Sequence, residues 1–328
     1  MTTILVTGGA GFIGSNFIDW IHRTREDICV VNLDKLTYAG DPANLEGISR
    51  GSAYHFVQGD ICDAPVVEGI FREYDIDAVF HFAAESHVDR SIRDSAVFVR
   101  TNVLGTQTLL EAARQAWERE DGSFRPGKRF LYVSTDEVYG SLEADEAPSR
   151  ETSFCRPNNP YAASKAAGDL LVSSYIHTYG FPANVTHCGN NYGPRQHREK
   201  FLPTVIRNLL EGKEIPVYGD GRNIRDWIYV EDHVRALEMI WEKGKPGEIY
   251  NIGASCERQN LEMIREVCQV MEEGGILMPS GGRITFVEDR KGHDRRYALD
   301  PEKVRQLGWR PKTGLREGLQ KTVEWYLK

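Results

Sequence analysis

The chain has 328 residues, 41% of them hydrophobic and 27% charged, which is enough to bury a sizeable core in an ordinary soluble globular protein. Its net charge of −8 excludes a broadly basic surface, so neither nucleic acid nor an anionic membrane is expected as a partner. Six scattered cysteines without metal-type spacing, and the lack of a long apolar run, predict buried reduced thiols, no metal site and a cytoplasmic location.

Strand and helix patterns alternate along the first part of the chain. Apolar strands are predicted at residues 3–6, 28–33, 54–58, 78–82, 129–134 and 183–187. Amphipathic helices are predicted at residues 12–22, 65–74, 95–117 and 161–179. This alternation predicts an α/β fold built on a Rossmann-like, doubly wound parallel sheet.

The pattern changes after about residue 188. Short strands at 215–218 and 284–287 alternate with helices at 202–210, 234–241, 261–270, 301–307 and 315–326. Residues 248–253 again look like a buried strand, so segment 227–253 is expected to return to the first sheet. We therefore predict two interleaved α/β parts, residues 1–187 with 228–253, and a smaller one made of residues 188–227 with 254–328.

A glycine-rich turn, GGAGFIG at residues 8–14, joins the first predicted strand to the first helix. Glycines at this spacing let the backbone approach a pyrophosphate at the N-terminus of a helix. Asp34 ends the second strand, where a carboxylate binds a ribose 2′-hydroxyl and repels a 2′-phosphate. The pattern favours NAD over NADP, and its alternative is a chance glycine turn with Asp34 as a cap.

Further candidates follow the third and fourth strands at the same sheet edge. Asp60 fits a contact with the adenine end of a dinucleotide, and equally an ordinary turn. The small residues Ala83 and Ala84 would let a cofactor lie close to the backbone. His87 fits either a substrate contact or a half-buried loop histidine.

The most informative stretch follows the strand at 129–134. Thr135, Asp136 and Glu137 come where that strand ends, at the edge where open α/β sheets bind ligands. Tyr161 and Lys165 are four residues apart on a predicted helix and therefore share a face. Together these groups suit a reaction with several proton transfers. The alternative is a solvated acidic turn and a chance Tyr/Lys pair.

Motifs spread over nearly the whole chain carry a resemblance to a known family. They are TGGAGFIGS (7–15), DKLTY (34–38), AAESHVDRS (83–91), STDEVYG (134–140), YAASK (161–165), NNYGP (190–194), IRDW (224–227) and GHDRRY (292–297). With these motifs the chain resembles the extended short-chain dehydrogenase/reductases, and more narrowly the dTDP-glucose 4,6-dehydratases. The triplet at 135–137 distinguishes the dehydratases from related epimerases and decarboxylases, which usually lack its acid pair.

This resemblance implies a reaction and a role for each residue of the acid–base set. Tyr161, as a phenolate stabilised by Lys165, would take the proton of the sugar C4 hydroxyl while hydride passes to NAD, and Thr135 would bond the C4 oxygen. Glu137 would remove the C5 proton, and a protonated Asp136 would protonate the departing C6 hydroxyl. Return of the hydride to C6 would give a 4-keto-6-deoxy sugar.

The resemblance also implies which residues bind each ligand. The cofactor-binding residues are Gly8, Gly11, Phe12, Ile13, Gly14, Asp34, Lys35, Leu36, Thr37, Asp60, Ile61, Ala83, Ala84, Ser86, Thr101, Tyr161, Lys165 and Asn191. The substrate-binding residues are Ser86, His87, Thr135, Asn190, Lys200, Phe201, Pro203, Pro216, Tyr218, Arg225, Asn260, Arg290 and His293.

Other expectations follow from charge, position and family analogy. Lys200, Arg225 and Arg290 are the predicted clamps for a diphosphate. Asn190 and Asn191 are expected in a loop just after the strand at 183–187. The first interleaved part would bind NAD and the second the nucleotide sugar. His197, His233 and Glu257 are expected to be surface or capping residues.

Departures from the family pattern and alternative functions stay open. Gly189, Cys256 and Lys291 stand where the family usually has Ser, Asn and Pro. The alternatives to a dehydratase are an NAD-dependent nucleotide-sugar epimerase or decarboxylase, and a dinucleotide-sensing protein without catalysis. Family analogy also predicts a homodimer, in which segment 95–117 and helix 161–179 of each copy form a four-helix bundle.

Overall fold

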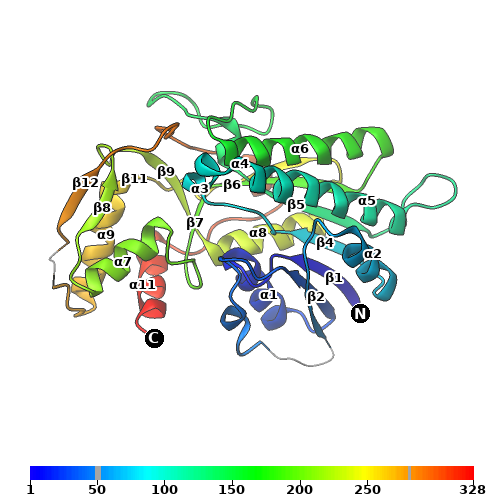
Figure 1. The fold of residues 1–328 in the computed structure, drawn as a ribbon, viewed down its shortest axis with the longest axis horizontal. Helices are drawn as coiled ribbons and strands as arrows, with labels where there is room; N and C mark the ends of the chain where they lie inside the picture. Colours follow the sequence, from blue (N-terminus) through cyan, green and yellow to red (C-terminus); the bar gives the residue numbers. More distant parts are fainter. Residues whose placement is uncertain (49–52, 280–281) are drawn as a thin grey trace.

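A twisted parallel sheet forms the larger part of the molecule in the computed structural model, which describes residues 1–48, 53–279 and 282–328 (Figure 1). Within the described residues this sheet has seven strands in the order β10-β6-β5-β4-β1-β2-β3, and every neighbouring pair is parallel. The strands are β1 (Thr2–Thr7), β2 (Ile28–Asp34), β3 (Tyr54–Gln58), β4 (Ala78–His81), β5 (Arg129–Thr135), β6 (Ala183–Cys188) and β10 (Ile249–Ile252). The predicted Rossmann-like fold is confirmed.

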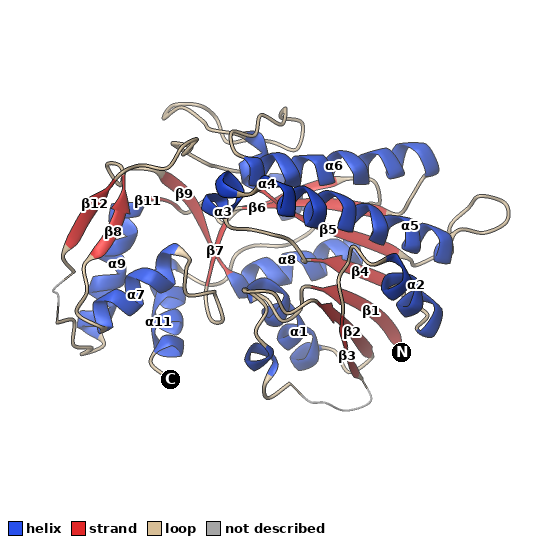
Figure 2. Cartoon of the chain, in the orientation of Figure 1, coloured by secondary structure: helices blue, strands red, loops and turns tan. Residues whose placement is uncertain are grey.

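Helices cover both faces of this sheet, which is why its strands read as apolar runs. One face carries α1 (Phe12–Thr24), α8 (Val230–Lys243) and the short α10 (Glu302–Gln306). The other carries α2 (Ala64–Glu73), α5 (Thr106–Trp117) and α6 (Pro160–Tyr179), as Figure 2 shows. Successive residues of β1 point to opposite faces of the sheet. Ile4 packs in the core on the side of α1, and Leu5 packs in the core on the side of α5.

A second group of elements lies beyond the carboxyl edge of the sheet (Figure 2). Helices α7 (Phe201–Leu210), α9 (Asn260–Glu273) and α11 (Leu315–Tyr326) pack around their own core with the parallel pair β8 (Ile215–Tyr218) and β12 (Ile284–Val287). Between this group and the large sheet, β9 (Ile224–Tyr229) pairs with β7 (Asn190–Tyr192) and with β11 (Glu257–Gln259).

The chain returns to the large sheet after β9, as predicted for segment 227–253. Helix α8 packs against α1, and β10 becomes the outer neighbour of β6. The division into two domains at residues 187, 227 and 253 stays a prediction, because pairing alone does not fix where one domain ends.

The predicted helix at 95–117 is interrupted. It is made of α4 (Ser95–Val99), the π-helical turn η2 (Arg100–Gly105) and α5, and the short α3 (Val88–Arg93) precedes it. Gly105 lies against Ile61, where an added Cβ would meet the Ile61 side chain at 2.5 Å. The π-helical turn also directs Asn102 and Thr106 into the interior, where both are fully buried.

The prediction of buried cysteines holds only in part. All six thiols are free; Cys29 and Cys188 are buried, whereas Cys155 is exposed in the segment before α6. In the described part of the chain, no helix combines the length and apolarity needed to cross a membrane.

Candidate active site

The acid pair lies at the end of the central strand, where β5 runs into the short 3-10 helix η3 (Asp136–Tyr139). The Thr135 hydroxyl caps η3 by accepting the Glu137 N–H at 3.3 Å, and it donates to Asp136 Oδ1 at 3.3 Å. Asp136 is only 4% exposed and Glu137 is half-buried. These burial values argue against the alternative of a solvated acidic turn.

The two carboxyl groups have different surroundings. Burial, together with the neighbouring Glu137 charge, raises the pKa of Asp136 well above its usual range, which favours a protonated acid. Burial also raises the pKa of Glu137, but the Arg225 charge and the Asn159 hydrogen bond oppose that shift. The pKa of Asp136 is raised further than that of Glu137, which makes Asp136 the candidate acid and Glu137 the candidate base.

Helix α6 brings the Tyr/Lys pair to the same edge. Asn159 caps the helix by accepting the Ala162 N–H at 2.8 Å, so Tyr161 lies in the first turn. The pKa of the Tyr161 phenol is raised well above 10, by burial first and then by the Glu137 charge, while the Thr135 side chain opposes the shift. The acid pair and the phenol therefore influence one another electrostatically.

Lys165 lies one turn further along α6. Its ammonium group donates to the Val133 carbonyl oxygen at 2.8 Å and lies 4.2 Å from the centre of the Tyr132 ring. Burial lowers the pKa of Lys165 to about 8, with the Asp169 charge opposing the shift. The predicted acid–base set therefore comes together at one sheet edge.

The glycine turn forms a close-packed cradle at the start of α1. Gly8 has a φ of 72°, and an added Cβ there would lie 2.7 Å from the backbone nitrogen of Ala83. At Gly14 an added Cβ would lie 2.3 Å from the Gly8 carbonyl oxygen. Among the described residues no side chain caps α1, so its first N–H groups remain available to a phosphate.

Most of the remaining predicted cofactor residues lie at or just after the ends of β2, β3 and β4, whereas Thr101 lies in η2 and Asn191 in β7 (Asn190–Tyr192). Asp34 accepts the N–H groups of Ala10 at 2.9 Å and Leu36 at 2.8 Å, which fixes the turn to β2. A carboxylate has further acceptor capacity for a ribose hydroxyl. Lys35 forms an ion pair with Asp60 at 2.7 Å. These contacts fit the adenosine half of a dinucleotide. The free N–H groups at the start of α1 and the close-packed glycine turn match the pyrophosphate of the same ligand.

Several predicted substrate residues lie around the start of α7 and the end of β8. The Lys200 ammonium donates to the Ser86 carbonyl oxygen at 2.7 Å, which links the start of α7 to the loop after β4. Arg290 lies over the Tyr218 ring at 4.8 Å, and the His293 ring lies 6.2 Å from the same ring. Arg225 is buried and donates to the Asp294 carbonyl oxygen at 2.9 Å.

Other predicted substrate residues are less closely tied to this group. Phe201 packs on Trp227 with ring centres 6.0 Å apart, and Asn260 begins α9 next to Asn223. Pro203 is buried in α7, whereas Pro216 is exposed on β8. For these residues a ligand contact stays a prediction.

The expectation that Asn190 and Asn191 lie in a loop is wrong. Both residues belong to β7, which pairs in parallel with β9. The Asn191 side-chain oxygen lies 2.9 Å from Nδ1 of His233. His233 is fully buried rather than at the surface, and burial lowers its pKa to about 3, so it is neutral there.

The departures from the family pattern have local explanations. A Cβ at Gly189 would lie 2.7 Å from the Asp226 carbonyl oxygen, so glycine permits the close approach of β9. The backbone N–H of Cys256 donates to the Asp226 carboxylate at 2.7 Å, a contact that does not depend on its side chain. Lys291 is exposed. None of them touches the acid–base set.

Sequence reasoning missed several residues that organise the site. Asn159 donates to Glu137 Oε2 at 3.2 Å, and the Tyr297 hydroxyl lies 3.5 Å from the same oxygen, which leaves Oε1 for a substrate. Asn102 bonds both the backbone of Glu85 and the Ser164 hydroxyl. Tyr297 belongs to the motif at residues 292–297, whereas no motif or periodic pattern of the sequence indicated a role for Asn102.

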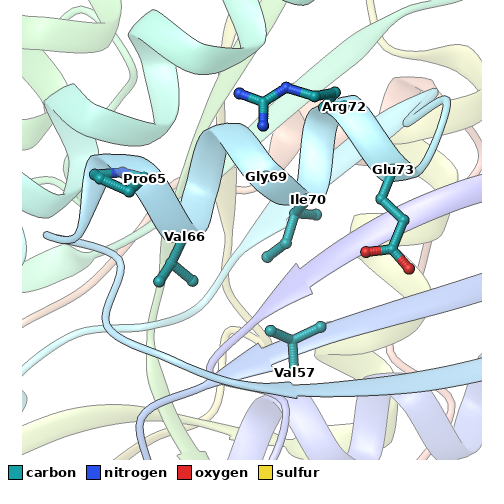
Figure 3. Close-up of a pocket in the computed structure, with 7 residues that line it drawn as sticks. All are labelled: Val57, Pro65, Val66, Gly69, Ile70, Arg72 and Glu73. Carbon is teal, nitrogen blue, oxygen red and sulfur yellow. The ribbon is translucent and has the colours of Figure 1, made fainter.

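A separate hollow lies between α2 and β3, away from the acid–base set (Figure 3). It is lined mostly by aliphatic groups such as Val57, Val66 and Ile70, with Arg72 and Glu73 at one end. It offers little for proton transfer. Among the described residues, no group of three or more His, Cys, Asp or Glu is placed to hold a metal ion.

The fold and the site define an enzyme of the short-chain dehydrogenase/reductase class that combines a dinucleotide cradle with an added acid pair. The family model described as GDP-mannose 4,6 dehydratase matches residues 5–322. The chain belongs to this family.

Individual relatives sharpen the comparison. The dTDP-glucose 4,6-dehydratase of Haemophilus influenzae is 48% identical, with 100% of this chain and 98% of that protein covered. The crystal structure of DesIV, a dTDP-glucose 4,6-dehydratase from Streptomyces venezuelae with NAD and TYD bound, has a TM-score of 0.89 at 44% identity, covering 99% and 97%. UDP-glucose 4-epimerase of Thermotoga maritima reaches 0.87 at 31%, covering 99% of each chain. Because a dehydratase and an epimerase are similar to this chain in fold to nearly the same degree, similarity of fold alone does not determine the reaction.

Proposed function

We propose that this protein is an NAD-dependent dTDP-glucose 4,6-dehydratase, a hydro-lyase that forms dTDP-4-keto-6-deoxyglucose and water. The observation that carries the proposal is the buried Asp136 next to Glu137, within reach of the Thr135 and Tyr161 hydroxyls. Removing water across C5 and C6 needs an acid and a base, whereas epimerisation at C4 does not. The dehydratase names of relatives that are about half identical support the same choice.

Each proton transfer of the proposed reaction is carried out by a particular side chain of this protein. Tyr161 takes the proton of the C4 hydroxyl, and Thr135 bonds the C4 oxygen. The ketone formed at C4 acidifies C5, whose proton goes to Glu137. Asp136 protonates the C6 hydroxyl as it leaves, which its raised pKa permits near neutral pH.

The cofactor residues hold NAD in the cradle of the glycine turn. Bound NAD supplies the acceptor for the C4 hydride and the source of the hydride returned to C6. The start of α1 and Gly8, Gly11 and Gly14 would face its pyrophosphate, and Asp34 its ribose. Because no net oxidant is consumed, the cofactor stays bound between turnovers.

The nucleotide sugar would lie between the large sheet and the second group of elements. Lys200, Arg225 and Arg290 supply positive charge for its diphosphate. Residues 1–187 with 228–253 would then form the NAD-binding domain, and residues 188–227 with 254–328 the nucleotide-sugar-binding domain. The free thiols support a reducing compartment such as the cytoplasm.

Incubation with separate nucleotide sugars tests the reaction. Given dTDP-glucose and no added NAD, the protein should form a product lighter by one water that develops the alkaline chromophore of a 4-keto sugar. UDP-glucose and GDP-mannose serve as parallel substrates and report the nucleobase preference. A C4 epimer or released carbon dioxide, without loss of water, would favour the epimerase or decarboxylase instead.

We also propose a homodimer formed through α5 and α6. Figure 1 shows α4, α5 and α6 side by side on one face of the sheet. Large apolar side chains are exposed there, among them Leu170 at 67%, Val99 at 55% and Leu104 at 49%. An exposed apolar face of this kind favours packing against a second copy of the chain. A two-fold axis would bring α5 and α6 of one copy against α5 and α6 of the other.

Replacing Leu170 by Glu is expected to convert the dimer to a monomer, because a charge would be buried at the centre of the contact. Sedimentation at working concentration should give twice 37.1 kDa for the unmodified protein and 37.1 kDa for the variant. Leu277→Glu is the control, since Leu277 is 80% exposed outside this face and should leave the mass unchanged. A monomeric unmodified protein would contradict the proposal.

A further inference from the structure

A chain of four buried polar side chains, which the proposed reaction does not use, connects the elements that carry the acid–base set. Asp169 lies on α6, His187 on β6, Tyr139 at the end of η3 and Asn251 on β10. Their exposed fractions lie between 0% and 6%. Nε2 of His187 lies 3.1 Å from Asp169 Oδ2, and Nδ1 lies 2.7 Å from the Tyr139 hydroxyl. That hydroxyl in turn lies 2.9 Å from Asn251 Oδ1.

The partners of these groups determine where the hydrogen atoms lie. The Ser149 carbonyl oxygen can only accept, so the Asn251 amide nitrogen donates to it at 2.9 Å and the amide oxygen faces Tyr139. Tyr139 therefore donates its single hydrogen to Asn251. The Tyr139 oxygen must then accept from Nδ1 of His187, which makes this ring nitrogen a donor.

A second hydrogen is needed at the other ring nitrogen. If His187 carried hydrogen on Nδ1 alone, Nε2 and the Asp169 carboxylate would be two buried acceptors 3.1 Å apart, which is unfavourable. The other Asp169 oxygen, Oδ1, is buried without a partner among the described residues, so no second hydrogen bond compensates such a contact. One further hydrogen therefore lies between the two groups. Imidazole binds a proton more tightly than a carboxylate does, which places that hydrogen on Nε2.

We propose that His187 is an imidazolium in a buried ion pair with Asp169, and that this ion pair holds η3 against α6. One ring N–H donates to α6 through Asp169, and the other donates to η3 through Tyr139. Asp169 lies one turn after Lys165 and two turns after Tyr161 on α6. Tyr139 ends η3, which carries the acid pair. His187 is thus a positioning residue, because it acts on the site through Tyr139 and Asp169.

The charges around the ion pair balance when His187 is an imidazolium. The titratable groups that act on Asp169 or Tyr139 are Lys165 on α6, Tyr132 on β5, and Glu151 and Cys155 in the segment before α6. Glu151 accepts the Asn251 N–H at 2.9 Å, so a carboxylate lies at each end of the chain of contacts. Asp169 and Glu151 then balance His187 and Lys165. A neutral His187 would leave one negative charge in excess, which is costly in a buried place.

Nuclear magnetic resonance of the ring nitrogens tests the ion pair. In protein labelled with ¹⁵N-histidine at about pH 7.5, where an ordinary imidazole is about nine-tenths neutral, both His187 nitrogens should have the chemical shifts of protonated nitrogens. The His187 signals are those lost in His187→Gln or, if that variant does not fold, those shifted in Tyr139→Phe. In Asp169→Asn an amide donor replaces the extra hydrogen, so Nε2 should become unprotonated while Nδ1 stays protonated. A bare ring nitrogen in the unmodified protein would overturn the ion pair.

The positioning role rests on the proposed function and is tested by separating the steps of the reaction. Tyr139→Phe removes the hydroxyl that joins His187 to η3 and keeps the whole acid–base set. After rapid mixing with dTDP-glucose, reduced nicotinamide should accumulate, because water elimination should slow on the order of 10-fold relative to C4 oxidation, as for one lost hydrogen bond to a charged group. Tyr175→Phe is the matched control, since Tyr175 is also buried and donates to a charged side chain, Glu111, at 3.1 Å. It should leave the ratio of the two rates unchanged.

Two outcomes would contradict the positioning role. One is a Tyr139→Phe variant in which both steps slow equally or neither slows. The other is the same change of ratio in Tyr175→Phe, which would reflect a general loosening of the fold. Failure of the proposed function would look different, because the unmodified protein would then form no 4-keto product, whereas the protonation of the His187 ring would be unaffected.

Discussion

Replacing Glu137 by Gln is expected to stop the reaction after oxidation at C4. The amide cannot accept the C5 proton, so turnover should fall by about 10²–10⁴-fold, the range for a lost general base. Absorbance of reduced nicotinamide should accumulate in the stopped complex, because C4 oxidation depends on Tyr161 and not on Glu137. In deuterated water the C5 position of recovered dTDP-glucose should carry no deuterium, as mass spectrometry would show.

Asp136→Asn is the matched partner of this variant. It keeps Glu137 and its hydrogen bonds to Asn159 and Tyr297, and removes only the acid. Deuterium should then enter C5 while water loss remains slow. If both variants instead turned over at close to the unmodified rate, the acid pair would have no part in the reaction, and the epimerase or decarboxylase alternative would be preferred.

Replacing Tyr161 by Phe is expected to block the reaction one step earlier. Without the phenol no group takes the C4 hydroxyl proton, so oxidation at C4 should fall by about 10²–10⁴-fold. No signal of reduced nicotinamide should appear on addition of dTDP-glucose. The amount of NAD that copurifies should be unchanged, because the glycine turn and Asp34 remain intact.

Tyr179→Phe supplies the control for this experiment. Tyr179 ends the same helix as Tyr161, is partly exposed, and has no contact with the acid pair. The same loss of a hydroxyl there should leave turnover within a factor of about two, as for most surface substitutions. Rapid appearance of reduced nicotinamide in Tyr161→Phe would contradict the role assigned to the phenol.

The large sheet could be predicted because its signals are local. Parallel strands covered on both faces are apolar throughout, and each of the predicted strands from residue 3 to residue 187 is present within one residue of its expected ends. Strand ends then place Thr135 and Asp34 at one edge without any knowledge of contacts. Helical spacing did the same for Tyr161 and Lys165.

What could not be predicted depends on contacts between distant segments. Strands β7 and β11 have only three residues each, too few for a periodic pattern, and both are defined by their pairing with β9. Tyr297 reaches Glu137 across 160 positions of sequence. The helix is interrupted at residues 100–105, where Gly105 packs closely on Ile61, a contact that no local pattern indicates.

The late arrival of β10 has a consequence for synthesis of the chain. The ribosome delivers β6, then β7, α7, β8, β9 and α8, before β10 can pair along the free edge of β6. During that interval the nascent sheet presents unpaired N–H and C=O groups on a strand that is buried throughout in the finished protein. We expect nascent chains stalled before residue 249 to associate with chaperones, and chains extended past residue 252 to be released from them.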